Sequence, residues 1–256
     1  MINVKSIVKI ILKVIFSKTG IPIKIGTNYM LWFHPLYFRW FTSSYETYHL
    51  DQLKNICDRP GIAIDIGAHF GLYSLILAKY NKMDVIAFEP TPYSAGIFKA
   101  NIHFNNLQSK ITLWEAAVGE KLGKALFLIQ ETDGAVSNSL VDYWHSDEKK
   151  NKVEVDVVNI DTVVDETVAF MKIDAEGNEL DVLKGAEKVI ASSRPWILLA
   201  LHPSAVRTKG DTLEMIWDHF SSLNYTALLG TKKLNKEEFI EKSELFDVML
   251  DPGNID

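Results

Sequence analysis

The sequence predicts an α/β fold in which a mostly parallel sheet carries helices on both faces. From residue 50 onward, short apolar runs alternate with longer helical stretches, the pattern of repeated strand–helix–strand units. The first run, at 61–67, is apolar except near its end, as in a strand covered on both faces. A glycine turn and a helix follow it directly, and cofactor-binding sheets often begin in this way.

The remaining elements follow from the same alternation of patterns. Helices are expected at 49–57, 71–81, 94–106, 178–192 and 212–223, and strands at 61–67, 83–90, 111–119, 169–174, 196–202, 225–229 and 246–250. The segment 120–165 breaks the rhythm, because strands at 124–130 and 153–161 surround a polar loop at 131–151. A loop of this length inside a compact domain is usually functional, so we expect an inserted substrate loop within the domain at 50–256.

Residues 1–49 are expected to form an N-terminal helix followed by an aromatic-rich segment. Lys5, Lys9 and Lys13 recur every four residues and therefore form one stripe of a helix with a broad apolar remainder. No charge-free run reaches the roughly 18 residues of a membrane-spanning helix. Two interpretations stay open. The favoured one docks the helix on its own domain or on a second copy in a homodimer, and the other lays residues 1–18 on a membrane surface.

Composition narrows the range of partners. The net charge is −6, and lysines and arginines are scattered, which disfavours a nucleic-acid ligand. The single cysteine, Cys57, cannot form an internal disulfide, which suits a reducing compartment. We therefore expect a cytoplasmic protein, with peripheral contact at the inner face of the membrane as the alternative. The Lys, Ile and Asn usage favours a bacterial source.

Polar residues gather where the predicted strands end. Asp65, Glu89, Asp174 and His202 end the first, second, fourth and fifth strands of the regular alternation. Ligands of open α/β sheets bind beyond the carboxyl ends of the strands. The sequence therefore predicts a ligand site that these four side chains share.

The glycine turn departs from the dinucleotide fingerprint. That fingerprint has a middle glycine that lets the backbone approach a pyrophosphate, whereas this turn has Gly67, Ala68 and Gly71. An acidic residue at its start, Asp65, suits an amino group or a cationic centre better than a phosphate. Glu89 is placed to accept hydrogen bonds from ribose hydroxyls. The residues thus indicate a nucleoside-containing cofactor and leave its type open.

Five motifs in order resemble the FkbM family of S-adenosylmethionine-dependent methyltransferases. They are AIDIGAHFGLYSLILA, VIAFEPTPYSAGIFKANIHFNN, AAVGE, VNIDTVV and FMKIDAEGNELDVLKGA, and the resemblance runs from about residue 45 to residue 202. It implies the class I methyltransferase fold, a Rossmann-like seven-stranded, mostly parallel sheet with one antiparallel strand near the C-terminus. It also implies methylation of hydroxyl groups on sugars, polyketides and related small molecules.

The resemblance assigns the cofactor-binding residues one by one. A short element folds over S-adenosylmethionine, the turn holds its methionine part, an acid binds the ribose hydroxyls, and a segment after the third strand flanks adenine. An aspartate of the fourth-strand motif faces the transferred methyl group. In this order the residues are Tyr45 and Glu46; Asp65, Gly67, Ala68, His69 and Gly71; Glu89; Glu115, Ala116 and Ala117; and Asp174.

Catalytic candidates are His202, Asp174 and Glu176. His202 is the first choice for a general base, because an imidazole titrates near pH 6.5. Asp174 is the second, or it ligates a hard metal ion that lowers the pKa of the acceptor. A metal ion is not favoured, because no oxygen cage is evident. Candidate acceptor-binding residues are Ser139, Tyr143, Trp144, Glu179 and His202.

Two residues depart from the family pattern. His69 stands where the family usually has asparagine, and Ala200 stands where its fifth strand has a glutamate two residues before His202. We expect an O-methyltransferase acting on a sugar hydroxyl of a nucleotide-sugar or surface polysaccharide. The alternatives are a polyketide-type acceptor, a nucleotide-dependent sugar oxidoreductase or epimerase, and a catalytically silent scaffold. The missing middle glycine and the lack of a Tyr-x-x-x-Lys pair disfavour the oxidoreductase or epimerase.

Overall fold

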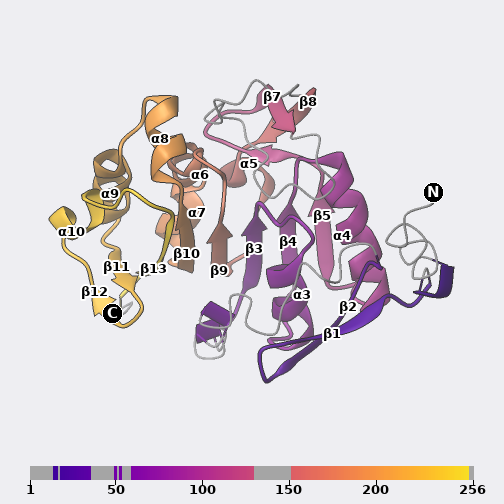
Figure 1. Ribbon diagram of the computed structural model, residues 1–256. Helices are drawn as coiled ribbons and strands as arrows, with labels where there is room; N and C mark the ends of the chain where they lie inside the picture. The colour runs from indigo at the N-terminus through magenta and orange to yellow at the C-terminus, as the bar shows by residue number, and fades with distance from the viewer. Residues whose placement is uncertain are drawn as a thin grey trace.

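The main sheet is mostly parallel with an antiparallel strand near the C-terminus, as the resemblance implies. The computed structural model describes residues 14–16, 18–35, 49–50, 52–53, 59–129 and 151–253 of the 256-residue chain. The sheet order is β12-β11-β13-β10-β9-β3-β4-β5 (Figure 1). The strands are β3 (Ile62–Ile66), β4 (Val85–Phe88), β5 (Ile111–Trp114), β9 (Val168–Ile173), β10 (Trp196–Leu201), β11 (Thr226–Leu229), β12 (Lys232–Lys233) and β13 (Phe246–Asp251).

The predicted seven-stranded class I sheet is confirmed. Strands β5, β4, β3, β9 and β10 pair in parallel, and β13 is antiparallel to both of its neighbours, β10 and β11. The two-residue strand β12 adds an eighth member at the edge by pairing antiparallel with β11. Because these five parallel strands run in the same direction, their carboxyl ends meet at one edge of the sheet.

Helices cover both faces of this sheet. They are α3 (Leu72–Lys79), α4 (Pro92–Phe104), α5 (Ile160–Val163), α6 (Glu179–Gly185), α7 (Glu187–Ser193), α8 (Pro203–Lys209), α9 (Leu213–Ser222) and α10 (Lys236–Ile240). Neighbouring residues of β3 divide between two apolar clusters. Ala63 packs with α3 and α4, and Ile64 packs with α6, α7 and α9. The period-two alternation of a buried strand thus builds two cores, one on each face.

Two predicted elements are each divided in two. The strand expected at 111–119 ends at Trp114, and β6 (Ala117–Val118) joins a separate sheet with β8 (Asn151–Val158) and β7 (Gly123–Ile129). The helix expected at 178–192 breaks between α6 and α7. At this break Gly185 packs so closely on the backbone that a Cβ would lie 2.2 Å from the Gly119 carbonyl oxygen. The β7–β8 pair lies toward the carboxyl edge of the main sheet (Figure 1).

The N-terminal region contains a hairpin that the sequence prediction missed. Strands β1 (Ile21–Ile25) and β2 (Tyr29–Phe33) pair antiparallel, and Leu31 and Phe33 are fully buried in the core beside α3 and α4. The Trp32 N–H donates to Oδ1 of Asn105, and the His34 N–H donates to Oδ1 of Asn101. The hairpin is therefore part of the same core as α4.

The rest of the predicted N-terminal organisation falls mostly outside the described residues. Residues 14–16 are helical, in agreement with the predicted helix, whereas 1–13 and 36–48 lie outside the part that the structure describes. Within the described part, no helix combines the length and apolar character needed to cross a bilayer. Most of the predicted substrate loop, at 130–150, also lies outside it.

Candidate active site

The turn after β3 is packed tightly against the end of β9. Gly67 and Gly71 both have left-handed backbones, with φ of 73° and 86°. A Cβ on Gly67 would lie 1.9 Å from the Asp174 carbonyl oxygen, and one on Gly71 would lie 1.9 Å from the Phe98 ring. Both positions therefore require glycine. We call residues 65–71 together with Glu89 the cofactor turn.

His69 occupies a left-handed position in this turn. Its φ is 50°, a region where asparagine and histidine are found more readily than most residues, so the structure accounts for both the family's asparagine and this substitution. Its N–H donates to Oε2 of Glu89 at 2.8 Å, and its ring stacks on Phe70. Burial, assisted by the charge of Lys172, lowers the pKa of His69 to about 4. The imidazole is therefore neutral at neutral pH.

Glu89 is buried and held by two backbone donors. Its Oε1 accepts the Thr91 N–H at 2.8 Å, and its Oε2 accepts the His69 N–H. Burial raises the pKa of this carboxyl, although the hydrogen bonds from Thr91 and His69 oppose the rise. Since each carboxylate oxygen carries a second lone pair, the side chain is oriented and retains acceptor capacity toward a ligand.

Asp65 holds the turn from within. Its Oδ2 accepts the Ser74 N–H at 3.1 Å and the Ser74 hydroxyl at 2.6 Å, which ties β3 to the start of α3. The side chain is 1% exposed, and burial raises its pKa against the charge of Lys172. Asp65 therefore supports the predicted cofactor turn through its bonds to Ser74, and its enclosed carboxylate is not presented to solvent.

The predicted adenine segment bridges two sheets. Glu115, Ala116 and Ala117 connect β5 to β6, and both alanines are buried. The carboxylate of Glu115 pairs with Lys99 on α4 at a partly exposed position. Exposed pairs of this kind contribute little to stability, so the segment's buried backbone and alanines are its structural contribution.

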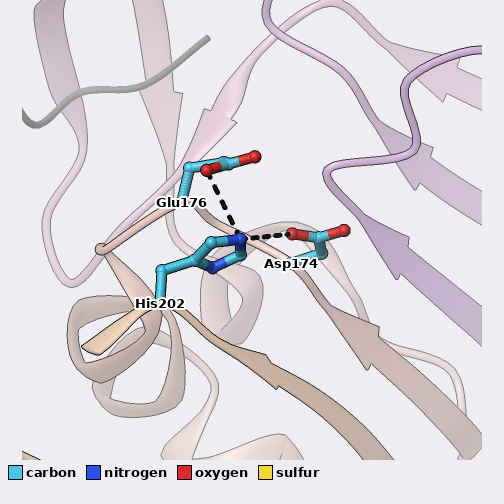
Figure 2. A group of neighbouring side chains, drawn as sticks. All are labelled: Asp174, Glu176 and His202. Carbon is cyan, nitrogen blue, oxygen red and sulfur yellow. Dashed lines mark ion pairs between the residues drawn. The ribbon is translucent and has the colours of Figure 1, made fainter. Parts of the chain in front are cut away.

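Three predicted catalytic residues come together beyond β9 and β10. Figure 2 shows the imidazole of His202 facing the carboxylates of Asp174 and Glu176. Nε2 of His202 lies 3.4 Å from Oε2 of Glu176 and 3.8 Å from Oδ1 of Asp174. The side chains of His202, Glu176 and Asp174 are 9%, 16% and 34% exposed, so the group is largely enclosed but reached by solvent at Asp174. We call these residues the acceptor group.

Glu179 holds the opposite nitrogen of His202. It is the first residue of α6 and is fully buried, and its Oε1 accepts the Gly177 N–H and lies 2.9 Å from Nδ1 of His202. Its Oε2 has no hydrogen-bond partner among the described residues. Glu179 is therefore placed to position His202, and its predicted contact with the acceptor stays a prediction.

The carboxylates around His202 change its protonation. Burial by itself would lower the pKa, but Glu179, Glu176 and Asp174 outweigh it and raise the pKa to about 9. The prediction of a histidine base assumed an ordinary pKa near 6.5. In the structure as described, His202 instead carries a proton at neutral pH.

Lys172 is a site residue that the sequence prediction missed. Its Nζ lies 3.1 Å from Oδ2 of Asp174 and 3.8 Å from Oδ1 of Asp65, and it donates to the Gly67 carbonyl oxygen. Burial by itself would raise the pKa of Asp174, but Lys172 and His202 lower it below its usual range. A lysine inside an otherwise apolar run at 168–173 was the available signal.

Five predicted site residues lie outside the described part of the chain. Tyr45 and Glu46 were assigned to the cofactor, and Ser139, Tyr143 and Trp144 to the acceptor. These assignments stay predictions.

The charge of the described site fits a cationic ligand better than a pyrophosphate. Carboxylates outnumber cations at the carboxyl edge, where Lys172 and the protonated His202 stand among Asp65, Glu89, Asp174, Glu176 and Glu179. An anionic pyrophosphate would add repulsion, whereas a sulfonium would offset part of the surplus. The donor set thus agrees with S-adenosylmethionine, which the resemblance implies.

Comparison with known proteins gives the family. The family model described as "Methyltransferase FkbM domain" matches residues 65–227. Methyltransferase sdnD of Sordaria araneosa is 25% identical over 199 residues, which are 65% of this chain and 76% of that protein. Methyltransferase 1 of Beauveria bassiana is 28% identical over 160 residues, which are 54% of this chain and 64% of that protein.

Solved structures resemble the chain at lower identity. Methyltransferase FkbM from Methylobacillus flagellatus is 21% identical with a TM-score of 0.47, covering 74% of this chain and 42% of that one. A Streptococcus mutans protein in complex with S-adenosylhomocysteine is 13% identical with a TM-score of 0.47, covering 79% of this chain and 94% of that one. The chain thus spans less than half of the Methylobacillus protein and just under two thirds of the Beauveria enzyme. The family assignment rests on the family model.

Proposed function

This chain belongs to the FkbM methyltransferase family, and we propose that it methylates a hydroxyl group of a sugar. Its methyl donor is S-adenosylmethionine, which supplies an electrophilic methyl group on a positively charged sulfur. Membership of this family removes the alternative of an oxidoreductase or epimerase. The sugar acceptor and the attachment to oxygen are our proposal.

The acceptor group is the single observation that carries the proposal. Carboxylates accept hydrogen bonds from hydroxyl groups, and Asp174 and Glu176 present two of them, with His202, beside the cofactor turn. Several hydroxyls of a sugar can bind such a group at once, so a polyol suits it better than an apolar acceptor. This chemistry supports a sugar from a nucleotide-sugar or a surface polysaccharide.

Within this proposal, and with no ion bound, the acceptor group orients the hydroxyl and takes its proton. The O–H bond breaks, the oxygen forms a bond to the methyl carbon, and the proton passes to a carboxylate of Asp174 or Glu176. Positioning provides most of the rate enhancement in such displacements. A placed proton acceptor adds about 10²–10⁴-fold.

Glu89 is proposed to bind the two ribose hydroxyls of the cofactor. Its two backbone bonds orient the carboxylate at the end of β4, where the strands open toward the ligand edge. Hydrogen bonds to a charged group contribute about 1.5–3 kcal/mol, so Glu89→Gln should weaken binding of S-adenosylhomocysteine by that amount in calorimetry.

The direct test is a mass-spectrometric screen of acceptors with S-adenosylmethionine. Nucleotide-sugars, oligosaccharides and polyketide-type alcohols are incubated with the protein, and products heavier by one methyl group are sought. We expect methylation among the sugar-containing acceptors. Methylation of polyketide-type alcohols alone would overturn the choice of sugar, and methylation of an amine or carbon alone would overturn O-methylation.

A variant pair connects the activity to the acceptor group. His202→Gln removes the imidazole on which Asp174 and Glu176 converge, so the misplaced carboxylates should cut turnover by about 100-fold or more, with the affinity for S-adenosylhomocysteine near that of the wild type. Glu244→Gln, which changes an exposed residue before β13, serves as the matched control and should keep full activity. Unchanged turnover in His202→Gln would remove the acceptor group from the mechanism.

A further inference from the structure

We propose that Asp174, Glu176 and His202 bind a divalent metal ion, with Mn²⁺ as the best-matched probe. Nε2 of His202 and one carboxylate oxygen from each acid lie within 4.8 Å of one another. Two donors that each stand about 2.1 Å from one ion are about 3–4 Å apart, and the 3.4 Å and 3.8 Å separations from Nε2 fall in this range. The three donors converge from the ends of two adjacent strands (Figure 2).

The surroundings of His202 are those of a metal-binding imidazole. Metal-ligating histidines commonly donate their second ring N–H to a carboxylate, which fixes the tautomer and the ring orientation. Glu179 provides this carboxylate at 2.9 Å from Nδ1. A bound ion would displace the proton from Nε2 and leave the hydrogen on Nδ1, so that the Nε2 lone pair faces the ion between Glu176 and Asp174. Glu179 is fully buried and its Oε2 has no hydrogen-bond partner among the described residues, so its charge is directed at the imidazole.

The charges around the group favour a bound cation. Four carboxylates, from Asp65, Asp174, Glu176 and Glu179, lie within reach of Lys172 or His202. Nζ of Lys172 pairs with Oδ2 of Asp174, and Oδ1 of the same carboxylate faces Nε2 of His202. Ion pairing with Lys172 therefore leaves one oxygen of Asp174 for an ion. With His202 neutral as a ligand, Lys172 offsets one of these four charges, and a divalent cation would offset two of the remaining three.

The donor set decides which ions suit the site. One imidazole nitrogen and two carboxylate oxygens combine a borderline ligand with hard ones, and Mn²⁺ accepts both kinds. Three protein donors leave coordination positions open on the exposed side of the group. A hydroxyl oxygen bound there would have its pKa lowered by the ion, and its proton would leave to solvent. This catalytic consequence rests on the proposed function, whereas the ion site itself does not.

The test measures Mn²⁺ binding directly, without turnover. The full chain is freed of metal with a chelator and titrated with Mn²⁺, and loss of the paramagnetic resonance signal of free Mn²⁺ reports binding. We expect one ion per chain. Glu176→Gln and His202→Gln should each weaken the affinity about 10-fold or more, and Glu244→Gln should match the wild type. Calorimetry with S-adenosylhomocysteine verifies that each variant is folded.

The outcomes separate this inference from the proposed function. Stoichiometric Mn²⁺ binding that both site variants weaken supports the inference, even if no hydroxyl acceptor is methylated. Absence of Mn²⁺ binding by a chain that binds S-adenosylhomocysteine overturns it, even if methyl transfer proceeds in the presence of a chelator. Binding that Glu176→Gln and His202→Gln leave unchanged also overturns it, because the ion would then occupy another place.

Discussion

The cofactor turn and the acceptor group lie side by side but satisfy their charges in opposite ways. In the cofactor turn, both Glu89 oxygens accept backbone N–H groups, and one oxygen of Asp65 accepts two bonds from Ser74. In the acceptor group, Asp174 and Glu176 converge on a single imidazole. The carboxylates of the first region are thus held mainly by hydrogen bonds, whereas those of the second face the ionisable side chains of His202 and Lys172.

This difference indicates how the two regions work. Backbone donors form part of the turn itself, so they orient its carboxylates without a ligand being bound. A proton or metal ion on the acceptor group can be exchanged, so its charge responds to what is bound. A preorganised region for the donor beside an adjustable one for the acceptor is well suited to a group-transfer site.

Removing Lys172 should have the largest effect, because its charge faces both regions. Lys172→Met leaves the buried carboxylate of Asp65 and the partly exposed carboxylate of Asp174 without their shared cation. Breaking a buried ion pair costs about 3–5 kcal/mol, so we expect a fall of this size in the free energy of unfolding, measured with urea.

The control is Lys110→Met, which removes the partly exposed ion pair with Asp84. That change should cost less than about 1 kcal/mol. Equal losses in the two variants would show that burial of Lys172 has no special consequence.

Gly67→Ala should disrupt the packing of the cofactor turn against Asp174 of the acceptor group. The added Cβ would collide with the Asp174 carbonyl in a backbone that already has a positive φ, so we expect a loss of about 2–4 kcal/mol and much weaker binding of S-adenosylhomocysteine. Gly96→Ala is the matched control. Its Cβ would meet nothing within 4 Å in α4, so it should stabilise the protein by roughly 0.5–1 kcal/mol. A fully stable Gly67→Ala protein would contradict the close packing of this turn.

Glu179→Gln should affect the acceptor group alone. The amide keeps the size of the side chain but removes the charge behind His202, so turnover should fall about 10–100-fold. The affinity for S-adenosylhomocysteine should stay within about twofold of the wild type. Glu187→Gln changes the corresponding first residue of α7, which is exposed, and should have no effect. Equal losses of turnover and cofactor affinity in Glu179→Gln would mean that the two regions are not separable.

Ser74→Ala should produce the smallest change and affect the cofactor turn alone. It removes the hydroxyl bond to the Asp65 carboxylate but keeps the backbone bond, so we expect a loss of about 1.5 kcal/mol in urea unfolding. Ser222→Ala, whose hydroxyl bonds a backbone carbonyl near the surface, should change stability by less than about 0.5 kcal/mol. If Ser74→Ala were also neutral, the Asp65–Ser74 contact would not stabilise the turn.

The class of the sheet and the edge at which the polar strand-end residues gather could be predicted, because both follow from the alternation of strands and helices. Once the alternation of strands and helices is recognised, Asp65, Glu89, Asp174 and His202 must meet at one edge. The β1–β2 hairpin was missed, although Ile21, Ile23 and Ile25 alternate with other residues ahead of a glycine turn. Many aromatic residues follow this turn, and they led to the prediction of a separate aromatic-rich segment instead of a hairpin.

The roles of individual side chains could not be read from sequence. Whether Glu179 faces the ligand or the interior depends on the turn at Gly177 and on where α8 places His202, which are tertiary contacts. The raised pKa of His202 and the pairing of Lys172 with two strands have the same origin. Sequence order identifies which residues share an edge, but their orientation is set by packing.

The contact between Gly67 and Asp174 fixes the distance between the end of β3 and the end of β9. The Asp174 N–H donates to the Ile66 carbonyl, and Lys172 bonds the Gly67 carbonyl, so the two strand ends are joined by direct hydrogen bonds. The ends of β3 and β9 should therefore move as one unit. The spacing between the cofactor turn and the acceptor group is then held constant. A misplacement of about 1 Å can cost 100-fold in rate. We therefore expect substitutions that change the acceptor to occur away from this contact between β3 and β9.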